Sequence, residues 1–195
     1  MGDCDLDPVA LFEQWATDAV TARIAGPNAT ALATADSDAA PSVRLVILRG
    51  FDSRGIVFHT NYNSRKGMEI EANPRASAVM LWHAMGRQVR IEGPVSKISG
   101  AESDNYFRSR SRSTQIDLLA SAQSRVITHI GEVEGHRLAE HRQWSDREIQ
   151  RRAYWGGYLV GLQMMEFWEN ATDGLHARVR FRRETNQWIR ERLAP

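Results

Sequence analysis

The stretch RLVILRGFDSRGIVFHTNYNSRK, residues 44–66, constrains the fold of this chain more than any other. Two strand-like runs, 43–49 and 55–60, flank a segment rich in glycine, aspartate and serine, and this pattern predicts a β-hairpin. Arginines and a lysine lie inside and just after the two runs. The stretch therefore places several cationic side chains around a compact apolar core.

The loop after this hairpin predicts an anion-binding helix start. Ser64 can cap a helix that begins with Arg65 and Lys66. The first turn of a helix offers unpaired backbone N–H groups and the positive end of the helix dipole. Arg44, Arg65 and Lys66 can therefore converge on one phosphate. The alternative is a capped surface helix whose basic residues are simply solvated.

The rest of the chain predicts strands and helices without a regular βαβ alternation. Helices are expected over residues 8–24, from 65 to 73, over 100–107 and 114–122, from about 127, and after a cap at Ser145. Strands are expected at 29–35, 43–49, 55–60, 76–83, 88–98, 154–162, 164–168, 177–183 and 188–193. Many antiparallel strands with a few helices predict one α+β domain over residues 1–195, centred on a β-barrel.

Composition narrows the class of protein. The 195 residues are 42% hydrophobic, enough for a core that needs neither disulfides nor a structural metal. Cys4 is the single cysteine, no apolar run is long enough to span a bilayer, and the N-terminus is acidic. We therefore expect a soluble cytoplasmic protein with no membrane partner. The net charge of +1 argues against broad binding to nucleic acid.

Two local patterns have plain interpretations. His129, His136 and His141 fall in one expected helix, where a solvated helix face is a better interpretation than a metal site, so we expect no metal. The RSRSRS run at 108–113 is interpreted as a compact anion-binding loop. The motifs GxGxxG, GxxxxGK[ST], GxSxG and HExxH are absent from the sequence, which removes support for the enzyme classes that use them.

Several segments carry a resemblance to a known family. They are RLVILRGF, VFHTNYNSRKG, ANPRASAVMLWHAMGRQVRIEG, ESDNYFRSR, STQI, SAQS, WGGY, EFWENATDGLHARVRF and the terminal RLAP. Together, from about Ala29 to Pro195, they resemble the pyridoxamine 5′-phosphate oxidase family of FMN-dependent split-barrel flavoproteins, which includes phenazine-biosynthesis oxidases. The resemblance implies an antiparallel split β-barrel with flanking helices. It also implies a homodimer with FMN at the subunit interface, held by residues from both chains.

The same resemblance implies which residues hold the cofactor. One subunit is expected to contribute Arg44, Leu45, Val46, Arg49, His59, Thr60, Arg65, Lys66 and Gln88. The partner is expected to contribute Gln123, Ser124, Trp155 and Arg178.

Substrate positions match the family less closely. The expected contacts are Arg49, Tyr106, Arg110, Thr114, Gly174 and His176. Arg49 and Thr114 replace a lysine and a serine, so charge and hydroxyl are preserved. Gly174 replaces an arginine and leaves room for a larger or less phosphorylated ring. His176 and Arg178 are the candidate catalytic residues that position substrate and flavin, with His176 as a candidate proton acceptor.

The implied function is that of an FMN-dependent oxidase, which dehydrogenates a small nitrogen heterocycle and passes the electrons to O₂. Gly174 favours a late oxidation step of phenazine biosynthesis. The first alternative is a pyridoxamine/pyridoxine 5′-phosphate oxidase that makes pyridoxal 5′-phosphate. The second is a non-catalytic flavin-binding protein.

Overall fold

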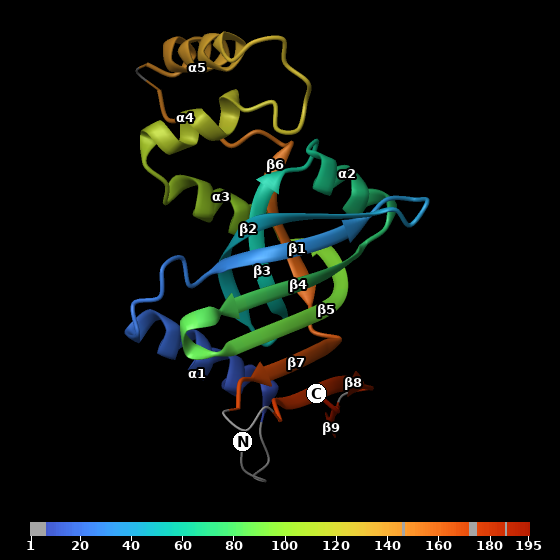
Figure 1. Cartoon of the computed structure of the whole chain (residues 1–195). Helices are drawn as coiled ribbons and strands as arrows, with labels where there is room; N and C mark the ends of the chain where they lie inside the picture. The colour runs from blue at the N-terminus through green and yellow to red at the C-terminus, as the bar shows by residue number, and fades with distance from the viewer. Residues whose placement is uncertain (1–6, 146, 172–174, 186) are drawn as a thin grey trace.

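Six antiparallel strands close a barrel at the centre of the molecule (Figure 1). The structure is a computed structural model that describes residues 7–145, 147–171, 175–185 and 187–195, so Cys4 and Gly174 lie outside it. The strands are β1 (Ala29–Ala35), β2 (Pro41–Asp52), β3 (Gly55–Asn61), β4 (Arg75–Trp82), β5 (Arg87–Lys97) and β6 (Trp155–Gly161). Their order is β1-β2-β3-β6-β5-β4, and β4 pairs with β1 to close the ring. The predicted α+β architecture with an antiparallel barrel is confirmed.

The sheet continues beyond the barrel through β5. This strand also pairs with β7 (Met164–Glu169), which pairs with the hairpin of β8 (Ala177–Glu184) and β9 (Gln187–Arg192). The register places Gln88 of β5 opposite Trp168 of β7, and Trp168 opposite Arg178 of β8. The three strands thus bring the candidate residues Gln88 and Arg178 into one row with Trp168 between them.

Helix α1 (Pro8–Thr21) covers the main core. Asp7 caps it by accepting a hydrogen bond from the Val9 N–H, and Pro8 occupies the first turn, as predicted. Its buried face contributes Trp15, whose ring meets Phe167 edge-on at 5.3 Å between centroids. The helix ends before residue 24 because Arg23 adopts a left-handed backbone with φ 54°.

The other helices lie toward the opposite end of the barrel from β8 and β9 (Figure 1). They are α2 (Arg65–Ala72), α3 (Gly100–Arg108), α4 (Arg112–Ala120) and α5 (Gly131–Gln143); the 3₁₀ turn His83–Met85 joins β4 to β5. The capping box predicted at Ser99 is present, with Glu102 as its reciprocal partner. A second core of Phe107, Ile116, Leu119, Ile149 and Trp155 joins α3 and α4 to β6.

Two helix predictions in this region need correction. The helix expected from about residue 127 begins at Gly131, where Glu132 accepts hydrogen bonds from the N–H and hydroxyl of Thr128. The helix expected after Ser145 is not formed over residues 147–150. Ile149 is buried in the second core, and an irregular chain path carries it there.

Strand β2 exposes its apolar side chains. Val43, Leu45 and Ile47 form an exposed row, here called the apolar row, and Leu45 is 74% exposed. The alternate residues Ser42 and Arg44 are half-buried on the other face. A row of this kind has no partner within the described part of the chain, and exposed apolar surface of this kind marks an interaction face.

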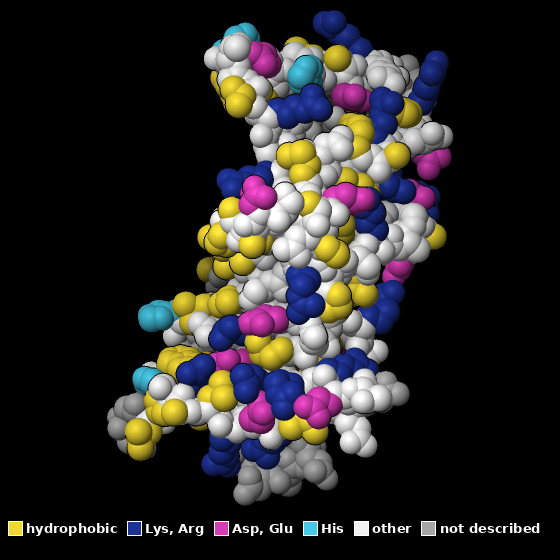
Figure 2. All heavy atoms as spheres, turned by 90° about the vertical axis from the view of Figure 1, so that its right-hand side faces the viewer, with side chains coloured by type: hydrophobic (Ala, Val, Ile, Leu, Met, Phe, Trp, Pro, Cys, Tyr) yellow, Lys and Arg dark blue, Asp and Glu magenta, His cyan; other side chains and the backbone are white. Residues whose placement is uncertain are grey.

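Charged side chains of both signs are mixed over the face shown in Figure 2. Ion pairs join neighbouring strands, such as those of Arg180 and Arg182 with Glu191. None of the described helices is long and apolar enough to cross a membrane. Over the same residues, no group of three His, Cys, Asp or Glu side chains is placed to hold a metal ion.

Candidate functional site

The predicted cations of the anion site surround a buried carboxylate, Glu69 of α2, which is 5% exposed. Its Oε2 lies 2.9 Å from Arg44 Nη2, and its Oε1 lies 2.8 Å from Arg65 Nε. The hydroxyls of Ser42 and Thr34 also donate to this carboxylate. Burial alone would raise the pKa of Glu69, but the hydrogen bonds from Ser42, Thr34 and the two arginines outweigh burial and lower it to about 2. Glu69 is thus an ionised carboxylate that binds two of the predicted cations, and it was not predicted from the sequence.

The guanidinium of Arg44 is largely occupied by hydrogen bonds to other groups of its own chain. Its guanidinium donates to the Leu32 carbonyl at 3.2 Å and to Thr34 Oγ1 at 2.5 Å, besides Ser42 and Glu69. It therefore braces β1 and β2 against α2.

Arg65 points outward from the same carboxylate. Its side chain is 64% exposed, and within the described residues only its Nε is engaged, by Glu69. The two terminal nitrogens are therefore available to an anion at the start of α2.

Lys66 lies beneath that helix start and is 6% exposed. Its Nζ is 3.2 Å from Thr60 Oγ1 and 3.1 Å from Ser64 Oγ. Burial, and then the nearby charge of Arg44, lower the pKa of Lys66 to about 8 against the opposite effect of Glu69. The ammonium is therefore held in a dry position by two neutral hydroxyls.

The helix start itself is built as predicted. Ser64 Oγ accepts a hydrogen bond from the Gly67 N–H at 3.4 Å. A Cβ at Gly67 would lie 2.1 Å from the Tyr62 carbonyl oxygen, so only glycine lets α2 begin this close to the loop. Arg44, Arg65 and Lys66 carry three positive charges and Glu69 one negative charge, which leaves two positive charges. That excess fits a phosphate group at neutral pH.

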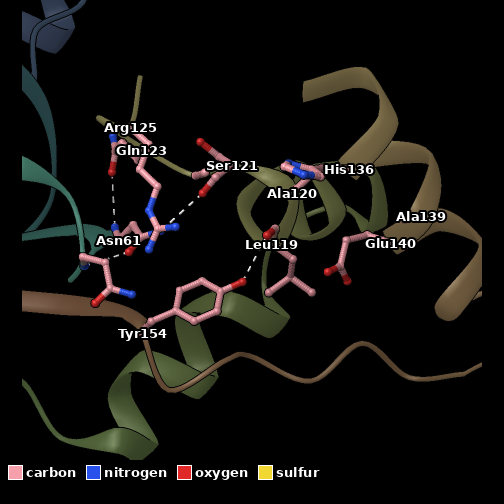
Figure 3. Close-up of a pocket in the computed structure, with 12 residues that line it drawn as sticks. Asn61, Leu119, Ala120, Ser121, Gln123, Arg125, His136, Ala139, Glu140 and Tyr154 are labelled. Atoms are coloured by element: carbon pink, nitrogen blue, oxygen red, sulfur yellow. Dashed lines mark hydrogen bonds between the residues drawn. The ribbon is translucent and has the colours of Figure 1, made fainter. Parts of the chain in front are cut away.

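Gln123 completes this cluster from the same chain. Its Oε1 accepts a hydrogen bond from the Thr60 hydroxyl at 3.0 Å. It also accepts one from the Asn61 N–H at 3.3 Å (Figure 3). Gln123 therefore contacts Thr60 within one chain, and its contribution to the site of the partner subunit stays a prediction. Ser124 follows with φ 71°, which turns the chain away after Gln123.

An open pocket of about 260 Å³ lies between Gln123 and α5 (Figure 3). Asn61 and Tyr154 border it, and the Tyr154 hydroxyl donates to the Leu119 carbonyl at 3.1 Å. The pocket separates the Gln123 loop from His136 of α5, so the flanking helices leave this side of the cluster open.

Three predicted contact residues gather around a fourth, His59, which directly precedes Thr60 in β3. The Tyr106 ring stacks on His59 at 3.7 Å between centroids, and the Arg110 guanidinium carbon lies 4.8 Å from the Tyr106 ring centre. Arg49 is the extra residue at a register shift between Leu48 and Gly50, and a bulge of this kind re-aims the side chain. Burial, followed by the charges of Arg49, Arg110 and Arg151, lowers the pKa of His59 to about 4. The structure thus brings Arg49, His59, Tyr106 and Arg110 together.

Two other predicted residues have structural roles here. Trp155 is 3% exposed and packs in the second core, 5.6 Å from the Phe107 ring and 5.5 Å from the His59 ring. Core packing encloses its ring in this chain, and its contact with a cofactor from the partner subunit stays a prediction. Thr114 lies in the first turn of α4, with its Oγ1 2.9 Å from Ser111 Oγ.

The RSRSRS run is not one anion-binding loop. Arg112 donates to the backbone carbonyls of Trp144, Ser145 and Arg147, which ties the chain after α5 to α4. Arg108 donates to Asn105. Arg110 remains the arginine of this run that lies with the predicted contact residues.

A second group of predicted residues lies on β5, β7 and β8. Arg178 binds Glu166 at 2.7 Å, and the His176 ring centre lies 4.9 Å from that of Trp168. Gln88 is opposite Trp168 in the sheet. Trp168 was missed as a site residue, although it stands in the segment EFWENATDGLHARVRF that carried the family resemblance.

The two groups are separate within one chain. Over the described residues, no hydrogen bond or ion pair joins Arg178 or His176 to the cluster around Glu69. Figure 1 shows β7 and β8 at one end of the molecule and α3 to α5 at the other. One chain therefore carries two separate groups of candidate residues.

Comparisons with known proteins give consistent matches. Residues 16–138 match the family described as "Pyridoxamine 5′-phosphate oxidase", and residues 155–195 match the "Pyridoxine 5′-phosphate oxidase C-terminal dimerisation region". A pyridoxine/pyridoxamine 5′-phosphate oxidase of Thermosynechococcus vestitus is 45% identical over 99% of this chain and 91% of its own. One of Pseudomonas paraeruginosa is 44% identical over 97% and 89%. The crystal structure of PhzG from Burkholderia lata, in complex with tetrahydrophenazine-1-carboxylic acid, is 32% identical with a TM-score of 0.93, over 99% of this chain and 95% of its own.

Proposed function

Because the chain belongs to the pyridoxamine 5′-phosphate oxidase family of FMN-dependent oxidases, we propose that it oxidises a small nitrogen heterocycle that bears an anionic group, with O₂ as acceptor. The observation that carries this proposal is the gathering of Arg49, Tyr106 and Arg110 around His59, which directly precedes Thr60, the hydroxyl partner of Lys66. One cationic cluster suits the phosphate of FMN, and the neighbouring one suits an anion on the substrate.

FMN phosphate fits the start of α2. Arg65 and Lys66 would bind it together with the first N–H groups of the helix, while Glu69 holds Arg65 and the hydroxyls of Thr60 and Ser64 hold Lys66. Thr60 and Gln123 border the same site and would meet the ribityl chain. The bound flavin supplies the two-electron oxidation, and the side chains supply position and charge.

The site is completed by a second subunit in this proposal. The match to a dimerisation region supports a homodimer, and the apolar row of β2 offers an exposed surface of the kind that dimers bury. The second group, Gln88, Trp168, His176 and Arg178, would then complete the site of the opposite chain. A barrel filled by its own side chains has no interior space for a flavin, so an interface is the natural location.

His176 suits the role of hydrogen-bond donor better than that of base. Its Nδ1 accepts the Ala171 N–H at 3.4 Å, so the neutral ring carries its proton on Nε2. Acceptance of a proton at Nδ1 would break that bond. We therefore assign to His176 the orientation of the substrate through Nε2–H.

Two substrates are consistent with this site. The 5′-phosphates of pyridoxamine and pyridoxine are the first candidates, since the relatives that are 41–45% identical over nearly the whole chain bear that name. A reduced tricyclic phenazine carboxylate is the second, since Gly174 lacks a long cation and Arg49 and Arg110 suit carboxylates. Gly174 favours the second candidate, whereas the names of the relatives favour the first.

A direct comparison tests the proposal. Under anaerobic conditions, the holoenzyme is mixed in a stopped-flow instrument with pyridoxamine 5′-phosphate, pyridoxine 5′-phosphate or a reduced phenazine carboxylate, and flavin bleaching is followed. Fast bleaching by a phosphorylated vitamer supports the first candidate, and fast bleaching by the tricycle alone supports the second. Bleaching by none of them, in a protein that binds FMN, would contradict the assignment as an oxidase of such heterocycles.

A further inference from the structure

An imidazole with no hydrogen-bond partner among the described residues lies beside Arg49, Tyr106 and Arg110, which are here called the substrate-anion site. Both ring nitrogens of His59 are buried and unpartnered among the described residues. A neutral imidazole has one N–H donor and one acceptor, and a buried polar group normally finds a partner. The register places His59 opposite Gly157 of β6, and a Cβ at Gly157 would lie 3.1 Å from His59 Nε2. The imidazole is therefore held closely between β6 and Tyr106.

The groups around His59 explain why it is neutral when no anion is present. Arg49 of β2, Arg110 after α3 and Arg151 before β6 all act on it with positive charge, and the Tyr106 ring of α3 stacks on it. Asp104 offsets part of this charge, because its carboxylate lies 2.6 Å from Arg151 Nε. Desolvation and the uncompensated charges of Arg49 and Arg110 thus disfavour the imidazolium.

Binding of an anion reverses this preference for the neutral imidazole. An anion held by Arg49 and Arg110 cancels the charge that opposes protonation, and it adds a negative charge near the ring. Tyr106 links the two, since its ring contacts both His59 and Arg110. We propose that His59 is the proton-linked residue of the substrate-anion site: it is neutral in the empty site and takes up a proton when a dianion occupies the space beside Arg49 and Arg110.

This inference rests on the proposed substrate-anion site and adds a selectivity to it. A dianion supports a protonated His59 better than a monoanion or a neutral group does, because its Coulomb energy with the ring is larger. Below neutral pH, the site therefore favours doubly charged groups. No covalent or redox step is involved, and the proton comes from solvent.

Calorimetry tests the linkage directly. Sulfate is the probe, because it does not titrate near neutral pH, and FMN-loaded protein is used so that the start of α2 is already occupied. Titration at pH 5.5 in two buffers of different ionisation enthalpy gives the protons taken up on binding. We expect uptake approaching about one proton per site, with sulfate affinity rising by up to about tenfold per pH unit as the pH falls from 6.5 toward 4.

The matched variants are His59→Phe, which keeps a flat ring for Tyr106, and His141→Phe on the exposed face of α5. The first should bind sulfate without proton uptake, and the second should behave as the unaltered protein. Should His59→Phe fail to fold, the carbon-bound imidazole proton signals of the unaltered protein are followed by NMR. The His59 signal should titrate at lower pH without sulfate than with it.

Two results would overturn the inference, and they are distinguishable. Sulfate that competes with substrate but binds without proton exchange overturns the role of His59 alone. If sulfate neither binds nor competes with substrate, that result contradicts the substrate-anion site itself and the proposed function with it.

Discussion

Arg44 Nη2 lies 2.9 Å from Glu69 Oε2, so an arginine expected to bind phosphate binds a buried carboxylate of its own chain. Arg65 shares that carboxylate, and hydroxyls from β1 and β2 complete its shell. Glu69 thus orients the cations without cancelling them. The anion site is an arranged network rather than a group of independent charges.

Glu69→Gln should destabilise the fold and weaken FMN binding. Removal of one partner from a buried ion pair leaves Arg44 uncompensated, at a cost of roughly 3 kcal/mol in the free energy of unfolding. Chemical denaturation and flavin fluorescence titration measure the two effects. Glu71→Gln, on the exposed face of the same helix, is the control and should change neither.

Glu69 should also account for part of the fall in the free energy of unfolding at low pH. Its folded pKa of about 2 lies below the unperturbed 4.5, so its contribution is complete above pH 4.5 and is lost as the pH falls toward 2. The unfolding free energy of Glu69→Gln should therefore fall less steeply over that range. Equal slopes for the two proteins would contradict the role of the ionised carboxylate.

Arg65→Ala should lower FMN affinity by one to two decades while the fold is retained. The loss corresponds to about 1.5–3 kcal/mol for one charge-assisted phosphate contact. Riboflavin, which has no phosphate, should bind both proteins alike. Arg54→Ala, an exposed arginine paired with Asp52 and Glu102, is the matched control. Unchanged FMN affinity in Arg65→Ala would show that the FMN phosphate does not bind at the start of α2.

FMN affinity should fall as the pH rises above about 8. Lys66 has a folded pKa of about 8, so the empty site loses its ammonium above that pH, and FMN binding then requires proton uptake. The expected slope approaches about tenfold per pH unit. Lys66→Met should bind FMN more weakly at pH 7 and lose this slope. A flat profile in the unaltered protein up to pH 10 would exclude Lys66 from the phosphate site.

Leu45→Asp should separate the subunits and release flavin. A carboxylate in the centre of the apolar row opposes burial of that row, and a separated chain lacks the second group of site residues. Sedimentation should show monomers with FMN affinity at least about tenfold lower. Leu138→Asp, at an exposed position of α5, should remain dimeric. FMN-saturated monomers would contradict the composite site.

Gly174→Arg should improve the oxidation of pyridoxamine 5′-phosphate and impair that of a larger ring. The added cation would contact the phosphorylated substrate, since polar pockets discriminate mainly through such partners. Stopped-flow bleaching with both substrates measures the change. If the unaltered protein already turns over the phosphorylated vitamer efficiently and the variant gains nothing, Gly174 is not a determinant of substrate choice.

Local chemistry made much of the fold predictable. Turn residues, caps and alternation located β1, the Ser64 cap and the Ser99 capping box within a residue or two. The helix expected after Ser145 failed because a cap motif is local, whereas the burial of Ile149 is a tertiary effect.

The site was harder to predict for the same reason. Glu69 looked like an ordinary helix residue, since only the packing of α2 on β1 and β2 shows what surrounds it. Trp155 and Trp168 are chemically alike, and the sheet register alone separates a core residue from a neighbour of Arg178. Sequence patterns identified the residue types of the site, but not the residues that hold them.

The two faces of β2 limit the insertions and deletions that this strand can accept. Arg44 and Leu45 are adjacent, so the strand presents its brace for α2 on one side and the apolar row on the other. Since side chains alternate along a strand, a one-residue insertion or deletion would turn the apolar row inward and expose Arg44 in the same event. Substitutions can adjust either face, but indels within β2 cannot be accommodated gradually. The length of this strand should accordingly be far less free to vary than its composition.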